Sequence, residues 1–160
     1  MCIRDRLWRC SEGGSVGKKA LSAIDIDHEV EPVRMATGGR TTAKRKLSSF
    51  LTNSLERYHL DRNSVENSAV SGLSPWLHFG HISSIEIVEQ ILEQSEWTPD
   101  HIDMSRKGSR EGWWGLSQGA ESFLDQIITW RELGFNNAYH NEDHNKFESI
   151  PEWAKKTLAE

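Results

Sequence analysis

The sequence predicts an all-α fold with no sheet, and three observations lead to that prediction. Apolar residues recur at intervals of three and four residues in several long segments, the period of a helix with one buried face. Residues that start helices, serine and proline above all, stand directly before these segments. No segment alternates apolar and polar residues as a half-buried strand does. With 160 residues and a hydrophobic share of 36%, the chain is long enough for one domain with a packed core.

The first forty residues differ from the rest of the chain. Residues 1–22 have neither a helical nor a strand period and contain glycine breakers, so we expect them to be disordered or foreign to the fold. Residues 23–40 are expected to form an extended linker, and residues 41–160 the helical domain. Both cysteines lie within the first ten residues, which predicts neither a disulfide framework nor a metal site.

The first helix is expected from about Thr41 to His59, with Thr41 or Thr42 as its cap. A polar loop follows, and Pro75 then begins a short helix that ends near Gly80. Apolar residues at helical spacing give the first helix one inward face: Leu47, Phe50, Leu51, Leu55 and Tyr58.

Ser83 is expected to cap the next helix, which continues to about Glu96. Its apolar residues predict an inward face, and its glutamates predict a face in solvent. The inward residues are Ile87, Val88, Ile91 and Leu92, and the outward ones are Glu86, Glu89, Glu93 and Glu96.

Three more helices are expected in the second half of the chain. Pro99 stands in the first turn of one that ends near Gly108. Ser117 caps the longest helix, which covers about residues 118–133. A loop rich in Asn, His and Asp follows, and Pro151 opens a last helix.

The charge pattern and two adjacent tryptophans leave alternatives open. The net charge of −5 excludes binding of nucleic acid by overall charge. The basic runs 44–46 and 106–110 are more often solvated faces than phosphate contacts. Trp113 and Trp114 lie in a glycine-flanked turn, where they either pack beneath the long helix or stack on nucleic-acid bases.

Several classes of protein and site are not predicted. No apolar stretch approaches the roughly 20 residues that a membrane span needs, and no signal peptide is visible, so we expect a soluble, cytoplasmic protein. His78 and His81 have a spacing that suits a metal but lack a third ligand. The stretch from His140 to His144 has its glutamate at the wrong place for a zinc-protease helix. No metal is therefore expected.

The most informative segment is the run from Ser71 to Ser83, which reads Ser-Gly-Leu-Ser-Pro-Trp-Leu-His-Phe-Gly-His-Ile-Ser. Its first four residues, Ser71, Gly72, Leu73 and Ser74, offer backbone N–H groups and two hydroxyls before a helix start. A buried phosphate needs such donors, because its desolvation is costly. On this pattern alone, an ordinary helix cap is the commoner explanation.

A second segment, Phe123 to Leu133, reads Phe-Leu-Asp-Gln-Ile-Ile-Thr-Trp-Arg-Glu-Leu. Together the two segments resemble the FAD-binding domain of the DNA photolyase and cryptochrome family, most closely the class II cyclobutane pyrimidine dimer photolyases and their bacterial relatives. The resemblance covers about residues 24–160 and implies the first half of the family's helical domain. It implies that the family's amino-terminal α/β domain and later helices are absent, and we therefore expect a fragment that is inactive by itself.

The resemblance also implies roles for individual residues. FAD would bind through its phosphates at Ser71–Ser74, with Tyr58 touching the flavin nucleotide, Arg62 bracing the loop and Arg131 near the flavin. Core packing is equally plausible for Tyr58 and is compatible with the binding role, whereas an ion pair within the helix is an alternative for Arg131.

The DNA side of the implied site consists of Gln126 and Trp130, which would face a pyrimidine dimer in damaged DNA. Many family members have Glu at the position of Gln126. An amide donates a hydrogen bond but exchanges no proton, so this departure bears on repair efficiency or on substrate class. Core packing is an equal alternative for Trp130, and no residue is assigned a catalytic role.

The function that the resemblance implies is light-driven DNA repair, in which reduced FAD donates an electron that splits a pyrimidine dimer flipped out of the duplex. One alternative is a cryptochrome-like flavin photoreceptor without repair activity. A helical interaction module that binds no flavin is the other.

Overall fold

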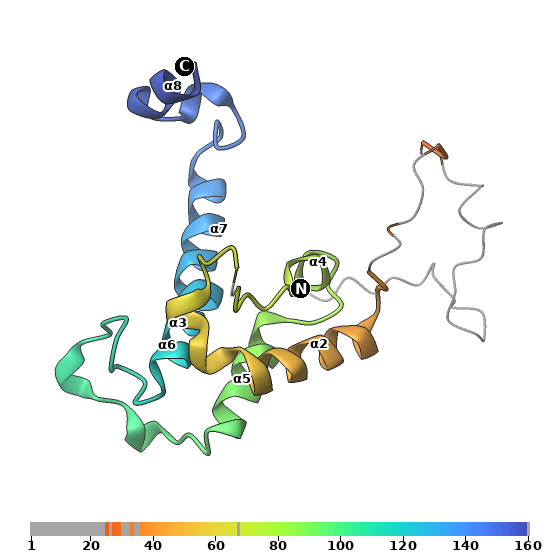
Figure 1. Cartoon of the computed structure of the whole chain (residues 1–160). Coiled ribbons are helices and arrows are strands. Elements are labelled where there is room, and N and C mark those ends of the chain that lie inside the picture. Colours follow the sequence, from red (N-terminus) through yellow and green to blue (C-terminus); the bar gives the residue numbers. More distant parts are fainter. Residues whose placement is uncertain (1–24, 26, 30–32, 34–35, 67, 160) are drawn as a thin grey trace. The chain divides into compact units, whose positions relative to one another are not determined.

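The computed structural model describes residues 25, 27–29, 33, 36–66 and 68–159 (Figure 1). The chain divides into two units, residues 1–37 and 38–160. The expectations for residues 1–22 and for both cysteines fall outside the described residues. Across the described part the chain is helical and contains no strand, which confirms the predicted all-α class. Within that part, no helix is both long enough and apolar enough to cross a membrane.

Helix α2 (Arg40–Asn53) begins without the predicted threonine cap. Its N-cap is Gly39, which adopts a φ of 98° and has no capping side chain. Thr41 and Thr42 lie inside the helix, so the predicted cap was wrong. The N–H of Gly39 instead donates to Nδ1 of His81 at 3.2 Å. A glycine turn held by a distant imidazole thus replaces the local hydroxyl cap.

The first helix is also shorter than predicted, because α2 ends at Asn53 and Ser54, its C-cap, leads into a 3-10 turn. A 3-10 turn, η1 (Leu55–Arg57), and the short helix α3 (Tyr58–Asp61) follow. The predicted inward face nevertheless continues through the break, and all five of its residues are buried: Leu47, Phe50, Leu51, Leu55 and Tyr58.

Helices α4 (Ser74–His78) and α5 (Ser84–Gln94) confirm two predicted elements. Oγ of Ser83 accepts the N–H of Glu86 at 3.1 Å, as a helix cap does. One outward glutamate departs from the expectation. The side chain of Glu86 is only 18% exposed and forms an ion pair with Arg40 at 2.7 Å. This pair joins the start of α5 to the start of α2.

The predicted helix between Pro99 and Gly108 is wrong. Two 3-10 turns occupy the segment, η2 (Pro99–His101) and η3 (Met104–Arg106). The side chain of Asp103 accepts the N–H of Ser105 at 2.9 Å, and Lys107 adopts a left-handed φ of 50°. Both features favour turns over a continuous helix.

The long helix begins where predicted and runs further. Oγ of Ser117 accepts the N–H of Ala120 at 3.3 Å. Helix α6 (Gln118–Leu124), the π-helical segment η4 (Asp125–Trp130) and helix α7 (Arg131–His140) then follow without a break. The loop expected after Leu133 therefore begins only after His140. The 3-10 turn η5 (Phe147–Ser149) and helix α8 (Glu152–Ala159) follow, the latter directly after Pro151 as predicted.

The core lies among α2–α6 and η4. An aromatic cluster forms its centre: the ring centroids of Phe50 and Phe123 lie 4.7 Å apart, and those of Tyr58 and Phe123 lie 5.1 Å apart in edge-to-face geometry. Such pairs add to the burial energy of the rings. Every residue of α7 is exposed, so α7 contributes nothing to this core.

Candidate cofactor-binding site

The loop that precedes α4 is held by its own residues and by the core. Oγ of Ser71 accepts the N–H of Leu73 at 3.3 Å. The side chain of Leu73 is fully buried, and its carbonyl accepts the N–H of Leu77 at 3.0 Å. Leu73 therefore anchors the loop, while its N–H is occupied by Ser71.

Other donors of this loop form no hydrogen bond among the described residues. Gly72 adopts a φ of 62°, and Ser74 is exposed. No hydrogen bond within the described residues uses the N–H of Gly72, the N–H of Ser74 or the hydroxyl of Ser74. Gly72 and Ser74 can therefore offer two backbone donors and one hydroxyl to an anion.

Lys46, a residue of α2, lies beside this loop. A Cβ placed on Gly72 would lie 2.9 Å from Cε and 3.3 Å from Nζ of Lys46. Nζ also lies 5.9 Å from the ring centroid of Trp76. Sequence reasoning treated this lysine as part of a solvated basic run. No local signal marks it, because the contact depends on how α2 packs against the loop.

Tyr58 and Arg62 lie together at the end of α3. Tyr58 is 8% exposed and completes the aromatic core, so the packing alternative for this residue is realised. The guanidinium carbon of Arg62 lies 5.9 Å from the Tyr58 ring centroid. Nη1 of Arg62 donates to Oγ of Ser122 at 3.5 Å. Burial raises the pKa of the Tyr58 hydroxyl, and the charge and hydrogen bond of Arg62 oppose that rise.

The free energy of unfolding is expected to fall above about pH 10, because Tyr58 loses its hydroxyl proton less readily in the folded chain than in the unfolded one. The pKa of its hydroxyl is raised in the folded state. Its contribution to stability is therefore complete below the unfolded pKa and is lost as the pH rises through the folded pKa. Urea unfolding between about pH 8 and 11 would measure this, with Tyr58→Phe as the control that lacks the titrating group. Parallel pH curves for the two proteins would contradict the assignment.

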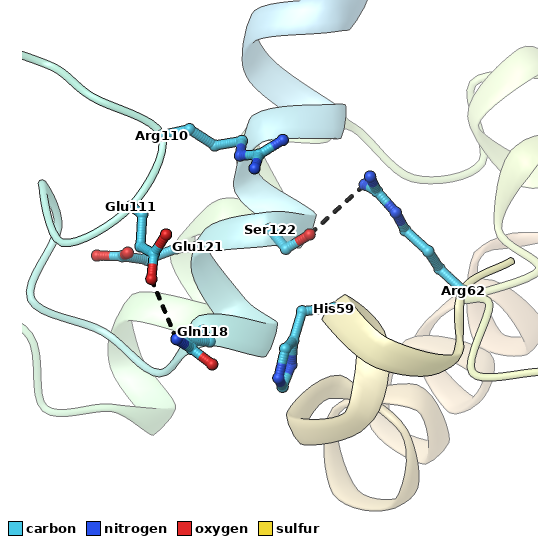
Figure 2. Close-up of a pocket in the computed structure, with 7 residues that line it drawn as sticks. All are labelled: His59, Arg62, Arg110, Glu111, Gln118, Glu121 and Ser122. Atoms are coloured by element: carbon cyan, nitrogen blue, oxygen red, sulfur yellow. Dashed lines mark hydrogen bonds between the residues drawn. The ribbon is translucent and has the colours of Figure 1, made fainter.

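A polar cavity lies next to Arg62 (Figure 2) and has a volume of about 210 Å³. His59 and Arg62 reach it from α3 and its end, Gln118 and Ser122 from α6, and Arg110 from the loop before α6. Two more lining residues, Glu111 and Glu121, complete it.

Glu121 is a buried carboxylate that organises the loop before α6. It is 3% exposed, and its Oε2 accepts the N–H of Gly112. Its Oε1 accepts the N–H groups of Trp114 at 3.0 Å and Leu116 at 3.4 Å. Sequence reasoning missed this residue. It could have been recognised from the sequence, because it is a charged residue at a position of the helix where the neighbouring pattern, up to Phe123, predicts a buried side chain.

The two tryptophans of this loop are half-buried. Trp114 packs against the core, and its carbonyl accepts the indole N–H of Trp97 at 2.7 Å. Trp113 and Trp114 both line a second cavity, of about 370 Å³, beside η4. The structure thus places Trp114 in a packing role.

The predicted DNA-facing residues lie on η4. Gln126 is half-buried, whereas Trp130 is 59% exposed and is not packed in the core. The indole N–H of Trp130 donates to Oδ2 of Asp125 at 3.0 Å. π-Helical turns occur often at functional sites.

Arg131 pairs within its own helix. Its Nη1 lies 2.7 Å from Oε1 of Glu132, and its guanidinium carbon lies 4.6 Å from the ring centroid of Phe135. The predicted site residues therefore form three groups: the Ser71–Ser74 loop, the Tyr58 and Arg62 pair, and η4 with Arg131. No hydrogen bond or ion pair among the described residues joins one group to another. Nor do three His, Cys, Asp or Glu side chains of that part gather closely enough to hold a metal ion.

Comparison with known proteins gives these groups a context. The chain is 31% identical over 112 residues, 69% of its length, to a deoxyribodipyrimidine photolyase of Oryza sativa. It is 26% identical over 137 residues, 86% of its length, to the enzyme of that name from Potorous tridactylus. The chain is a relative of the deoxyribodipyrimidine photolyases.

A third photolyase, from Methanothermobacter thermautotrophicus, is 27% identical over 149 residues, or 93% of this chain. The match covers only 28% of that photolyase, 22% of the Potorous enzyme and 19% of the rice enzyme. No protein-family model matches the chain. The photolyase relationship and the all-helical fold agree with the resemblance carried by the two sequence segments.

Proposed function

We propose that this chain forms part of a FAD-dependent, light-driven enzyme that splits pyrimidine dimers in DNA. The observation that carries the proposal is the loop of Ser71–Ser74, anchored by Leu73 and open at its remaining donors, in a relative of the photolyases. The chain spans 19–28% of the length of the photolyases that it matches. We therefore propose that the chain alone performs no repair.

The loop suits the pyrophosphate of FAD. Its open N–H groups at Gly72 and Ser74 and the Ser74 hydroxyl are the donors that a phosphate accepts. Gly72 adds no side chain, and the end of the Lys46 side chain lies where its Cβ would be. Ser71 accepts the N–H of Leu73 and so holds the loop in shape, while its own hydroxyl proton can still be donated. Bound FAD, when reduced, would supply the light-driven electron for dimer splitting.

Tyr58 would contact the flavin nucleotide in the proposal, beside Arg62. The Tyr58 ring is fixed by two edge-to-face contacts, with Phe50 and Phe123. Its hydroxyl is neutral at physiological pH, since the ordinary tyrosine pKa is about 10 and burial raises the pKa of this one. It can therefore donate a hydrogen bond to the flavin nucleotide.

Residues of η4 would meet the DNA. The exposed indole of Trp130, held by Asp125, offers a flat apolar face on which a flipped dimer can pack. The Gln126 amide can donate one hydrogen bond to a pyrimidine carbonyl. Arg131, balanced by Glu132, would lie near the flavin.

A chimera tests the proposed function. Residues 38–159 of this chain would replace the matching segment of the Methanothermobacter photolyase. The purified protein would be assayed for bound FAD and for light-dependent splitting of a thymine dimer in a short duplex. The proposal predicts that the chimera retains both properties, and that changing Trp130 to Ala lowers repair with FAD still bound.

The other outcomes separate the alternatives. A folded chimera that binds FAD but repairs no dimer, with the unaltered relative active in the same assay, would indicate a cryptochrome-like photoreceptor. A folded chimera without FAD would overturn the flavin assignment and favour a helical module that binds no flavin.

A further inference from the structure

Lys46 stands out among the basic residues of α2 by its surroundings. It is exposed, yet its Cε and Nζ lie 2.9 Å and 3.3 Å from the position of a Cβ on Gly72. The end of this side chain thus lies against the backbone of the Ser71–Ser74 loop at Gly72.

The ammonium of Lys46 is not neutralised. No carboxylate of the described residues forms an ion pair with it, whereas Lys44, two residues earlier, lies 3.5 Å from Oε1 of Glu86. The Trp76 ring, 5.9 Å from Nζ, attracts the charge weakly and keeps it near the loop. A positive charge that forms no ion pair among the described residues thus lies beside the Ser71–Ser74 loop at Gly72.

The loop itself supplies no charge. Its four residues, Ser71, Gly72, Leu73 and Ser74, are all neutral, whereas the pyrophosphate of a dinucleotide carries negative charge that is costly to desolvate without a cation. Hydrogen bonds in which one partner is ionised are about twice as strong as neutral ones. The loop therefore needs a positively charged side chain nearby to balance the charge of a bound pyrophosphate.

We propose that Lys46 binds the pyrophosphate at the Ser71–Ser74 loop and makes the site selective for phosphate-bearing flavins over riboflavin. This inference rests on the proposed function and assigns the charge of its cofactor site. Lys46 touches the phosphate directly, through Nζ, on the Gly72 side of the loop. Lys44, the other lysine of α2, takes no part, because its ammonium group forms an ion pair with Glu86.

The test measures dissociation constants of the full chain for FAD, ADP and riboflavin by equilibrium dialysis. ADP carries the pyrophosphate without the flavin ring, and riboflavin carries the ring without phosphate. Lys46→Gln is expected to weaken FAD and ADP binding about tenfold at low salt and to leave riboflavin unchanged. The affinity of the variant should also depend less steeply on salt, because one cation–phosphate contact is lost. Lys46→Arg should keep most of the affinity.

Lys44→Gln is the matched control, because it removes a positive charge from the same helix. Equal losses for both lysine variants would overturn the inference, since only overall charge would then matter. Unchanged FAD binding by Lys46→Gln, with wild-type binding intact, would overturn it and leave the proposed function standing. A folded wild-type chain that binds neither FAD nor ADP would overturn the inference, and the chimera would still decide the proposed function.

Discussion

Replacing Glu121 by alanine is expected to lower the free energy of unfolding by about 3 kcal/mol. The carboxylate is buried and accepts three backbone N–H groups, those of Gly112, Trp114 and Leu116. Alanine leaves these donors without an acceptor and opens a void beneath the loop. Urea denaturation followed by tryptophan fluorescence would measure the loss, because the affected loop carries Trp113 and Trp114.

Glu111→Ala is the matched control for this prediction. Glu111 is exposed and accepts one hydrogen bond, from the Gln118 amide at 3.1 Å. Its removal should cost less than about 0.5 kcal/mol. Glu121→Gln should fall between the two variants, because one amide oxygen can still accept N–H groups. A Glu121→Ala protein as stable as the Glu111→Ala protein would show that the carboxylate does not hold this loop.

Replacing Gly119 by alanine is expected to destabilise the fold by about 2–3 kcal/mol. A Cβ at Gly119 would clash with the backbone carbonyl of Leu55 and lie 2.8 Å from that of Glu56. Both carbonyls belong to η1, so neither can move without shifting the turn that connects α2 to α3. Thermal or urea unfolding of the variant measures the cost of this clash.

Gly134→Ala provides a control of the same substitution type. Gly134 also lies in a helix, α7, but nothing stands within 4 Å of a Cβ there. Since alanine is the better helix former, this change should stabilise the chain by about 0.5–1 kcal/mol. The two substitutions should therefore have opposite signs. Destabilisation of similar size at both positions would contradict the close approach of α6 to η1.

The sequence predicted the helical class and most of the buried faces, because these depend on the spacing of apolar residues. The caps at Ser83 and Ser117 were correct for the same local reason: the hydroxyl and the N–H that it accepts are three residues apart. The predicted threonine cap failed because Gly39 is held by the distant His81. Such a partner cannot be found by reading along the chain.

Two helix boundaries were missed for physical reasons that no local pattern carries. The break at Ser54 accompanies the close packing of Gly119 against η1, a contact between segments far apart in sequence. The long helix continues past Leu133 through residues that are all exposed, so apolar spacing gave no indication of it.

The candidate site was predictable only in part. The Ser71–Ser74 loop and the pair of Tyr58 and Arg62 follow from motif and resemblance, and their roles in binding stay predictions. Lys46 was considered only as part of a basic run, because its proximity to Gly72 arises from the packing of α2. The exposure of Trp130 and its bond to Asp125 likewise depend on the π-helical turn.

The most direct test of the account is a visible absorption spectrum of the purified chain after incubation with FAD and removal of free ligand, with riboflavin treated in parallel. We predict retained flavin absorbance with FAD and none with riboflavin, because the proposed binding donors lie at the phosphate loop. Loss of FAD from a chain whose circular dichroism remains helical would contradict the claim that Ser71–Ser74 and its neighbours form a cofactor site.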